Sequence, residues 1–205
     1  MNKIFRSFIL YHKGGLIILD KKEALKTVAY EIFAKKGYKA TGISEIAKQA
    51  GVAVGSFYNY YESKEAIFLD IYVEENNRVR QAMIEKIDWE MDMIDLISQI
   101  FGYSRHLVSY NKILMEWYNP AIANELHKYY SSEEGKIANP FHQFLVKTFT
   151  SRLTAEGYSQ EKIQDILQVY DLFYYMDMNI TENDFPDISK TIEILATNFV
   201  KGILK

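Results

Sequence analysis

The sequence contains no cysteine, and only three prolines and ten glycines among its 205 residues. Without cysteine the chain has no disulfide framework, no thiolate metal site, no cysteine nucleophile and no thiol-based redox switch. The few prolines and glycines exclude a collagen-like chain or a Pro/Gly-rich disordered one. A chain without cysteine suits a reducing compartment, and we expect a cytoplasmic protein.

Long apolar runs are also missing. The most apolar stretch, residues 4–19, is interrupted by charged residues, a histidine and two glycines, whereas a membrane-spanning helix needs about 20 predominantly apolar residues. The block Phe8–Tyr11 follows Lys3 and Arg6, but it is shorter than the apolar core of a signal peptide and no small-residue cleavage site follows it. We therefore expect no membrane partner.

The net charge of -3 hides a segregation of charge along the chain. Residues 1–64 hold 11 Lys/Arg and 5 Asp/Glu, a local net charge of +6, whereas residues 65–205 carry -9. Such asymmetry indicates a basic binding module joined to an acidic body. Residues 88–205 are not expected to touch DNA, because the negative charge of the body opposes that of the phosphates.

Helical periodicity runs through nearly the whole chain. Asp20 and Glu23 have the spacing of a capping box, and an apolar stripe at i, i+3, i+4, i+7 and i+8 begins at Leu25. Gly37 is expected to close this helix in a left-handed conformation. Asn119 and Asn139, each followed by proline, are typical of N-caps. The pattern predicts further helices over about 43–50, 54–60, 64–87, 91–110, 112–118, 120–135, 140–155, 159–178 and 187–204.

The segment 41–65 carries the functional information. Two short helices around a glycine-containing turn predict a helix-turn-helix. Ala47 and Ala50 are small enough to let the helices approach, Gly51 permits the turn, and Val52 and Phe57 fill the small core.

The residues left on the outer face of the second helix are expected to enter the major groove, which displays a base-specific pattern. Base contacts are expected from Val54, Gly55, Ser56, Asn59 and Tyr60, and Tyr61 is expected to lie in the core. Phosphate contacts are expected from Lys39, Lys48, Tyr58, Lys64 and the backbone N–H groups at Ser63.

Residues 20–67, about a quarter of the chain, resemble the N-terminal domain of TetR-family transcriptional regulators. The matching positions are Gly37, Thr41, Ile46-Ala47, Ala50-Gly51-Val52, Gly55, Tyr58, Tyr61 and Ser63-Lys64-Glu65. The resemblance implies that Ser56, Tyr58, Tyr60 and Lys64 touch DNA. Two departures are Ala53, where Ser or Thr is frequent in the family, and the longer and more apolar lead at residues 1–19.

These observations predict an all-α fold of about nine helices, with a helix-turn-helix DNA-binding domain over 20–66 and a larger effector-binding and dimerisation domain over 67–205. Residues 1–19 form an N-terminal extension, for which we favour a mobile segment or an added helix over a minor-groove arm carrying Lys3 and Arg6. The predicted DNA contacts are Thr41, Lys48, Val54, Gly55, Ser56, Tyr58, Asn59, Tyr60, Ser63 and Lys64.

The acidic body is rich in aromatic residues and methionine. Most of them are expected in the core, because large side chains at helical spacing usually are. The resemblance adds a buried pocket for a small hydrophobic or aromatic effector. Its candidate residues are Tyr103, His106, Tyr110, Trp117, Tyr118, Phe144, Tyr170 and Tyr174.

The last two predicted helices each carry an apolar stripe that could pack on its own body or form a two-fold four-helix bundle. A homodimer predicts a palindromic double-stranded DNA operator whose half-sites are spaced by helical turns. The candidate interface residues are Ile163, Leu167, Ile188, Ile192, Leu195 and Phe199.

Two other functions were weighed. A catalytic site has little support, because Ser104 and His106 are two residues apart on a helix and face different directions. The four histidines lack zinc spacing, and no glycine-rich phosphate loop occurs. We expect no catalytic residue, metal or cofactor. A constitutive architectural DNA-binding protein would not need the large aromatic body. The sequence therefore favours a ligand-responsive regulator, with repression as the expected mode.

Overall fold

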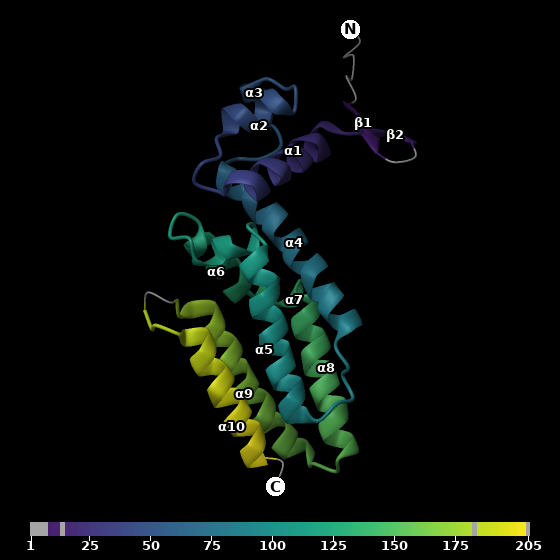
Figure 1. Cartoon of the computed structure of the whole chain (residues 1–205), viewed down its shortest axis with the longest axis vertical. Coiled ribbons are helices and arrows are strands. Elements are labelled where there is room, and N and C mark those ends of the chain that lie inside the picture. The colour runs from purple at the N-terminus through teal and green to yellow at the C-terminus, as the bar shows by residue number, and fades with distance from the viewer. Residues whose placement is uncertain (1–7, 13–14, 182–183, 204–205) are drawn as a thin grey trace.

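The computed structural model describes residues 8–12, 15–181 and 184–203. These residues form an elongated helical molecule with one short hairpin (Figure 1). Its elements are β1 (Phe8–His12), β2 (Gly15–Leu19), α1 (Lys21–Lys36), α2 (Ile43–Gln49), α3 (Val54–Phe57), α4 (Lys64–Lys86), α5 (Met93–Tyr110), the 3-10 helix η1 (Leu114–Tyr118), α6 (Ala123–Ser131), α7 (Glu133–Ile137), α8 (Pro140–Ala155), α9 (Gln160–Asn179) and α10 (Ile188–Ile203).

The N-terminal hairpin differs from the expected mobile segment or added helix. β1 and β2 pair antiparallel, with Phe8 opposite Leu19 and His12 opposite Gly15. Isoleucine and aromatic residues favour strands, and two adjacent glycines between two such runs favour a hairpin. The expectation of a helix here did not take this strand preference into account. The hairpin lies at the N-terminal end of α1, to the side of α2 and α3 (Figure 1). The minor-groove candidates Lys3 and Arg6 lie outside the described residues.

Three predicted helix N-caps are confirmed. The side chains of Asp20, Ser63 and Asn139 each accept a hydrogen bond from the backbone N–H three residues later, at 2.8–3.1 Å. The N-cap predicted at Asn119 is wrong. Its side chain accepts from the N–H of Ala121 within a turn, and α6 begins only at Ala123.

The single helix expected over 120–135 is two helices. Ser132 lies between α6 and α7, donating its hydroxyl to the Tyr129 carbonyl at 2.6 Å and accepting from the Gly135 N–H at 3.0 Å. A Cβ atom on Gly135 would lie 2.0 Å from the Tyr129 carbonyl oxygen, so this corner requires glycine. With this break, the described part of the chain has ten α-helices and the 3-10 helix η1, where about nine helices were expected.

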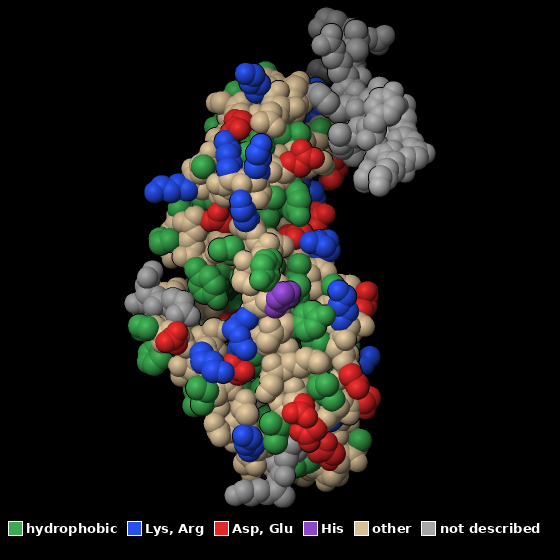
Figure 2. Space-filling model, in the orientation of Figure 1, with side chains coloured by type: hydrophobic (Ala, Val, Ile, Leu, Met, Phe, Trp, Pro, Cys, Tyr) green, Lys and Arg blue, Asp and Glu red, His purple; other side chains and the backbone are tan. Residues whose placement is uncertain are grey.

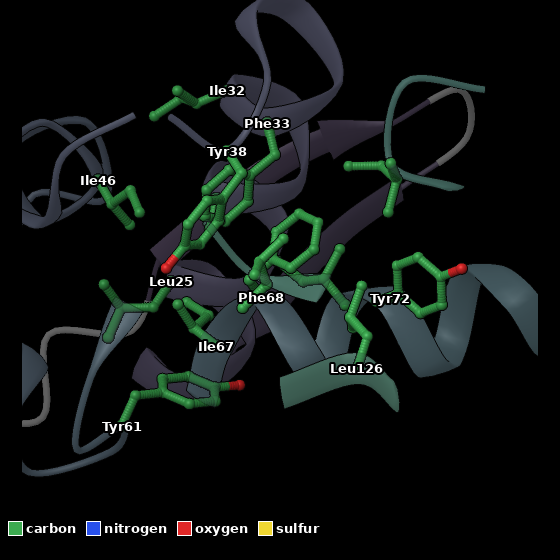
Figure 3. Packing of buried hydrophobic residues seen from close by; sticks show 14 of the residues in the cluster. Leu25, Ile32, Phe33, Tyr38, Ile46, Tyr61, Ile67, Phe68, Tyr72 and Leu126 are labelled. Atoms are coloured by element: carbon green, nitrogen blue, oxygen red, sulfur yellow. The ribbon is translucent and has the colours of Figure 1, made fainter. Parts of the chain in front are cut away.

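The first core cluster joins the DNA-binding end to the body. Phe33 of α1 and Tyr38 both contact Phe68 of α4, with ring centroids 4.9 and 5.0 Å away. Leu126 of α6 belongs to the same cluster (Figure 3). One continuous core therefore runs across the predicted domain boundary at residues 66 and 67, which falls in the first turn of α4 and stays a prediction.

The body is built around a ring of five helices. α4 contacts α5, α5 contacts α10, α10 contacts α9, α9 contacts α8, and α8 closes the ring on α4. All five run along the long axis of the molecule (Figure 1). We call this arrangement the helix ring. No helix among the described residues is both long and apolar enough to cross a membrane.

Candidate nucleic-acid interface and effector site

The turn between α2 and α3 is fixed by glycine and by short-range hydrogen bonds. Gly51 has a φ of +61°, a conformation that side chains other than glycine rarely adopt. The Val52 N–H donates to the Ala47 carbonyl at 2.9 Å across the turn. Ala47, Ala50 and Phe57 are buried between the two helices. The predicted helix-turn-helix packing is therefore present.

The surface of α3 and the turn after it is exposed and partly apolar. Val54, Tyr58 and Tyr60 keep 42%, 54% and 38% of their surface accessible, and Asn59 is also exposed. α3 ends at Phe57, so the expected helix over 54–60 is shorter and residues 58–60 continue it as a turn. These side chains share one end of the molecule with the exposed Lys48.

The fold leaves open space next to the Cα atom of Gly55. A Cβ atom built there would meet no other atom within 4 Å. The residue is exposed in the first turn of α3, between Val54 and the half-buried Ser56. The space above Gly55 is therefore open to a binding partner.

Two predicted DNA contacts have roles inside the protein. Thr41 is only 3% exposed, and its hydroxyl donates to the Gly37 carbonyl at 2.8 Å, so the predicted DNA contact by its side chain is wrong. The Lys64 ammonium donates to the carbonyls of Tyr38 and Thr41, both at 3.1 Å, and lies 4.0 Å from the centre of the Tyr38 ring. Lys64 thus orders the segment that leads into α2.

Two more residues near the start of α4 are held by the fold. The Ser63 hydroxyl caps α4 by accepting from the Ala66 N–H. Tyr61 is buried and donates to Asp70 at 2.7 Å, which confirms that it belongs to the core. In Figure 2, lysine and arginine side chains lie among a few acidic ones at the α1–α3 end, and a group of aspartate and glutamate side chains lies near the opposite end of the body.

Comparison with known proteins identifies this domain. Residues 27–71 match the family model described as bacterial regulatory proteins, tetR family. Residues 27–71 are therefore a TetR-family DNA-binding domain. This match spans α2, the turn and α3, together with parts of α1 and α4. It confirms the resemblance carried by the sequence of the helix-turn-helix.

Several curated transcriptional regulators are similar to part of the chain. The chain is 46% identical over 50 residues to the uncharacterized HTH-type transcriptional regulator YerO of Bacillus subtilis, covering 24% of this chain and 17% of that one. It is 41% identical over 59 residues to the fatty acid metabolism regulator protein of the same organism, covering 29% and 30%. With QacR of Staphylococcus aureus it shares 25% identity over 128 residues, covering 60% and 68%. The match thus spans under a third of the first two relatives' length.

Two solved structures share the fold of most of the chain. RolR in complex with the ligand resorcinol has a TM-score of 0.60 at 18% identity, covering 86% of this chain and 85% of that one. Thermus thermophilus FadR in complex with lauroyl-CoA has a TM-score of 0.51 at 21% identity, covering 84% and 89%. At these identities the likeness shows the fold alone.

Half of the predicted effector residues lie in the helix ring. Tyr103, Phe144 and Tyr170 are half-buried and pack against the second core cluster, which includes Met83 and Phe141. The Tyr174 hydroxyl donates to the Tyr130 carbonyl at 3.3 Å. These aromatic side chains are the part of the prediction that the fold places in one region.

The other predicted effector residues lie elsewhere. His106 and Tyr110 are on the exposed side of α5, where Tyr110 is 80% accessible, and Tyr118 is also exposed. Trp117 stacks on Tyr72 in the junction between η1 and α4. The exposed positions of His106, Tyr110 and Tyr118 contradict an interior pocket position for these three residues. Trp117 is half-buried among aromatic side chains, so its ligand contact stays a prediction. Aromatic density along the sequence did not indicate which helix face is covered.

The helix ring also contains polar residues that the sequence analysis missed. His142 Nδ1 lies 2.9 Å from the Tyr170 hydroxyl, and Asn139 donates to the Tyr174 hydroxyl at 3.4 Å. Burial lowers the pKa of His142, so its ring is expected to be neutral at pH 7. Burial raises the pKa of both tyrosines, which keeps their hydroxyl groups protonated. The only earlier indication was Asn139, predicted solely as a helix cap.

The predicted dimer residues divide in the same way. Ile163, Ile188 and Ile192 are buried within the protomer and cannot face a partner, so these predictions are wrong. Leu195 is 45% exposed, whereas Leu167 and Phe199 are half-buried. The exposed apolar residues on the outer sides of α9 and α10, here called the α9–α10 patch, are Leu172, Tyr175, Ile194 and Leu195.

η1 fastens the body to the DNA-binding end. A Glu116 carboxylate oxygen accepts the Tyr38 N–H at 2.7 Å, just beyond the end of α1. Lys112, before η1, donates to the carbonyl of Lys35 at 2.9 Å. Side chains of the body therefore form hydrogen bonds with the Lys35 carbonyl and the Tyr38 N–H at the end of α1. A shift of η1 would change these two contacts.

Gly37→Ala is expected to lower the free energy of unfolding by about 1–3 kcal/mol. Gly37 has φ +81° and ψ 172°, a region restricted to glycine rather than the expected left-handed helical conformation, and an added Cβ would lie 2.8 Å from Glu116 Oε1. Gly102→Ala is the matched control, because Gly102 lies inside α5 with no atom near a Cβ, and alanine there should stabilise by about 0.5–1 kcal/mol. Chemical denaturation of both variants measures this difference. Equal effects would contradict the role of the Gly37 backbone.

Proposed function

We propose that the protein is a ligand-responsive repressor that binds a palindromic operator as a homodimer in the cytoplasm. The observation that carries the DNA-binding part is the exposed surface of α3 and the turn after it, with Val54, Tyr58 and Tyr60 outward and Phe57 buried beneath. Inserted into a major groove, α3 would read base edges, while Lys48 and Tyr58 would contact phosphates. The family match over residues 27–71 supports this use of the surface.

The α9–α10 patch supports dimerisation. Soluble monomers seldom expose several large apolar side chains on two neighbouring helices. α9 and α10 pack against each other, and Phe173 of one contacts Phe199 of the other, so their outer faces adjoin. A two-fold axis through these faces would form a four-helix bundle and set two copies of α3 on one side of the dimer.

The helix ring supports an effector site. Aromatic side chains with a few polar groups suit a small hydrophobic or aromatic ligand. The similar structures of RolR and Thermus thermophilus FadR hold resorcinol and lauroyl-CoA. A ligand that prefers one arrangement of the ring would shift the dimer between two separations of its α3 helices. The Glu116 and Lys112 contacts to the end of α1 offer a direct route for that coupling.

In vitro selection from random duplex DNA tests the proposed function. The full chain is expected to enrich an inverted repeat, because a two-fold dimer presents two identical reading surfaces. The selected duplex then serves as the operator in binding assays. Enrichment of a single asymmetric site would contradict the dimeric reading, and absence of enrichment would support the alternative of a non-specific architectural DNA-binding protein.

A further inference from the structure

Arg80 extends from α4 into the helix ring. Its Nη1 donates to the Ser104 hydroxyl on α5 at 2.7 Å and lies 3.3 Å from the sulfur of Met83. The guanidinium carbon is 5.1 Å from the centre of the Phe141 ring on α8. Arg80 is half-buried. Its positive charge therefore lies between three helices of the ring.

The charge of Arg80 has no carboxylate partner in contact. Arg78 pairs with the buried Glu75, and Arg105 pairs with the buried Glu193. Among the described residues, no carboxylate oxygen lies within 4.0 Å of an Arg80 nitrogen. A half-buried charge without a counterion is costly, and proteins usually pair such groups.

Asp177 of α9 is the acidic group whose charge reaches Arg80. Desolvation by neighbouring groups raises the pKa of Asp177, although the residue is exposed, and the Arg80 charge opposes that rise. Asp177 nevertheless makes no ion pair with Arg80, and it keeps accessible surface. The negative charge of Asp177 therefore lowers the positive potential near Arg80. It forms no ion pair with the guanidinium.

The guanidinium fork retains binding capacity. Arginine has five N–H donors in a planar arrangement that matches a carboxylate through two parallel hydrogen bonds. The hydrogen bonds from Arg80 to described residues all start from Nη1, which leaves Nε and Nη2 to donate elsewhere. The aromatic rings of Phe141 and Tyr170 lie in the same region, and the charge of Arg80 is felt by Tyr170.

The helix ring thus combines a cation that contacts no carboxylate among the described residues with an aromatic wall. We propose, resting on the proposed effector function, that the effector is an organic acid whose carboxylate binds the Arg80 guanidinium while its apolar part packs against Phe141 and Tyr170. Ser104 positions the guanidinium for this contact by accepting from Nη1. The acid supplies the counterion that the protein does not place within contact of Arg80.

Matched acid and amide probes test the proposal in the full chain. The pairs are benzoate with benzamide, phenylacetate with phenylacetamide, and octanoate with octanamide, titrated at pH 7 by calorimetry. At least one acid is expected to bind about tenfold or more tightly than its amide, because hydrogen bonds between charged groups are the stronger ones. Arg80→Gln should remove this preference and leave amide binding unchanged.

Two further variants keep the test decisive. Lys86→Gln removes one positive charge from the exposed end of the same helix and should retain the full preference for the acid. Ser104→Ala frees the guanidinium without removing it and should reduce the preference several-fold, which provides a readout if Arg80→Gln fails to fold. Equal binding of acid and amide, survival of the preference in Arg80→Gln, or no binding of any acid at millimolar concentration would each overturn the proposal.

Operator binding separates this proposal from the function it rests on. One outcome is that a neutral amide binds in the ring and releases the operator as well as its acid does. That result would support the ligand-responsive regulatory function and contradict the proposal that the effector is an organic acid. If the operator is never bound, the regulatory function itself fails. If the acid releases the operator from the wild-type protein but not from Arg80→Gln, both are supported.

Discussion

Gly55→Glu is expected to lower operator affinity by about a hundredfold or more while leaving the thermal unfolding midpoint unchanged. A hundredfold loss corresponds to about 2.7 kcal/mol, the size expected when base contacts are lost and a like charge is added beside the DNA. Folding should tolerate the change, because a Cβ at Gly55 meets no atom within 4 Å. Glutamate in the first turn of a helix is also favourable.

The affinity is measured by fluorescence anisotropy with the selected operator duplex. Ser151→Glu is the matched control, because it adds the same negative charge at an exposed position of α8, on the body. It should change the affinity by less than about threefold, since most of its field is screened at physiological salt. Similar losses in the two variants would mean that net charge, rather than contact at α3, governs binding.

The double variant Leu172→Glu/Leu195→Glu is expected to make the protein monomeric at micromolar concentration. Leu172 and Leu195 are 54% and 45% exposed, on the outer faces of α9 and α10. Burying a leucine side chain contributes about 1.5–3 kcal/mol, and a two-fold interface counts each substitution twice. Together with four added carboxylates, this should raise the dimer dissociation constant by about a thousandfold or more.

Sedimentation velocity measures this change, and operator affinity should fall with it, because one protomer holds only one half-site. Ile137→Glu is the control: Ile137 is 70% exposed but lies on α7, outside the α9–α10 patch. Its dimerisation should match that of the wild-type protein. A dimeric Leu172→Glu/Leu195→Glu variant would place the interface elsewhere and leave the exposed leucines without a role.

The helix-turn-helix could be predicted from sequence because its determinants are local. Gly51, the small residues at 47 and 50, and the plug at Phe57 lie within one short segment, and each has the predicted position. Helix caps at Asp20 and Ser63 were predictable for the same reason. Thr41 was the exception, since a family position that matches in sequence does not show whether its side chain faces outward.

The body was less predictable, because its contacts join distant segments. On α10, periodicity marks both Ile192 and Leu195 as apolar, yet Ile192 is buried in its own protomer and Leu195 is not. An apolar stripe indicates that one face of a helix is buried. It does not indicate whether that face packs against the same protomer or against a second copy of the chain. Arg80 belongs to no motif, and its position becomes informative only when α4, α5 and α8 are brought together.

Methylation interference on the selected operator shows whether α3 enters the major groove at two symmetric half-sites. Methyl groups at guanine N7 project into the major groove, where α3 is proposed to read bases. We expect interference in two clusters related by the two-fold axis of the operator, with centres about one helical turn or a whole multiple apart. Both clusters should vanish for Gly55→Glu. Interference confined to one cluster, or none in the major groove of a bound operator, would contradict this mode of binding.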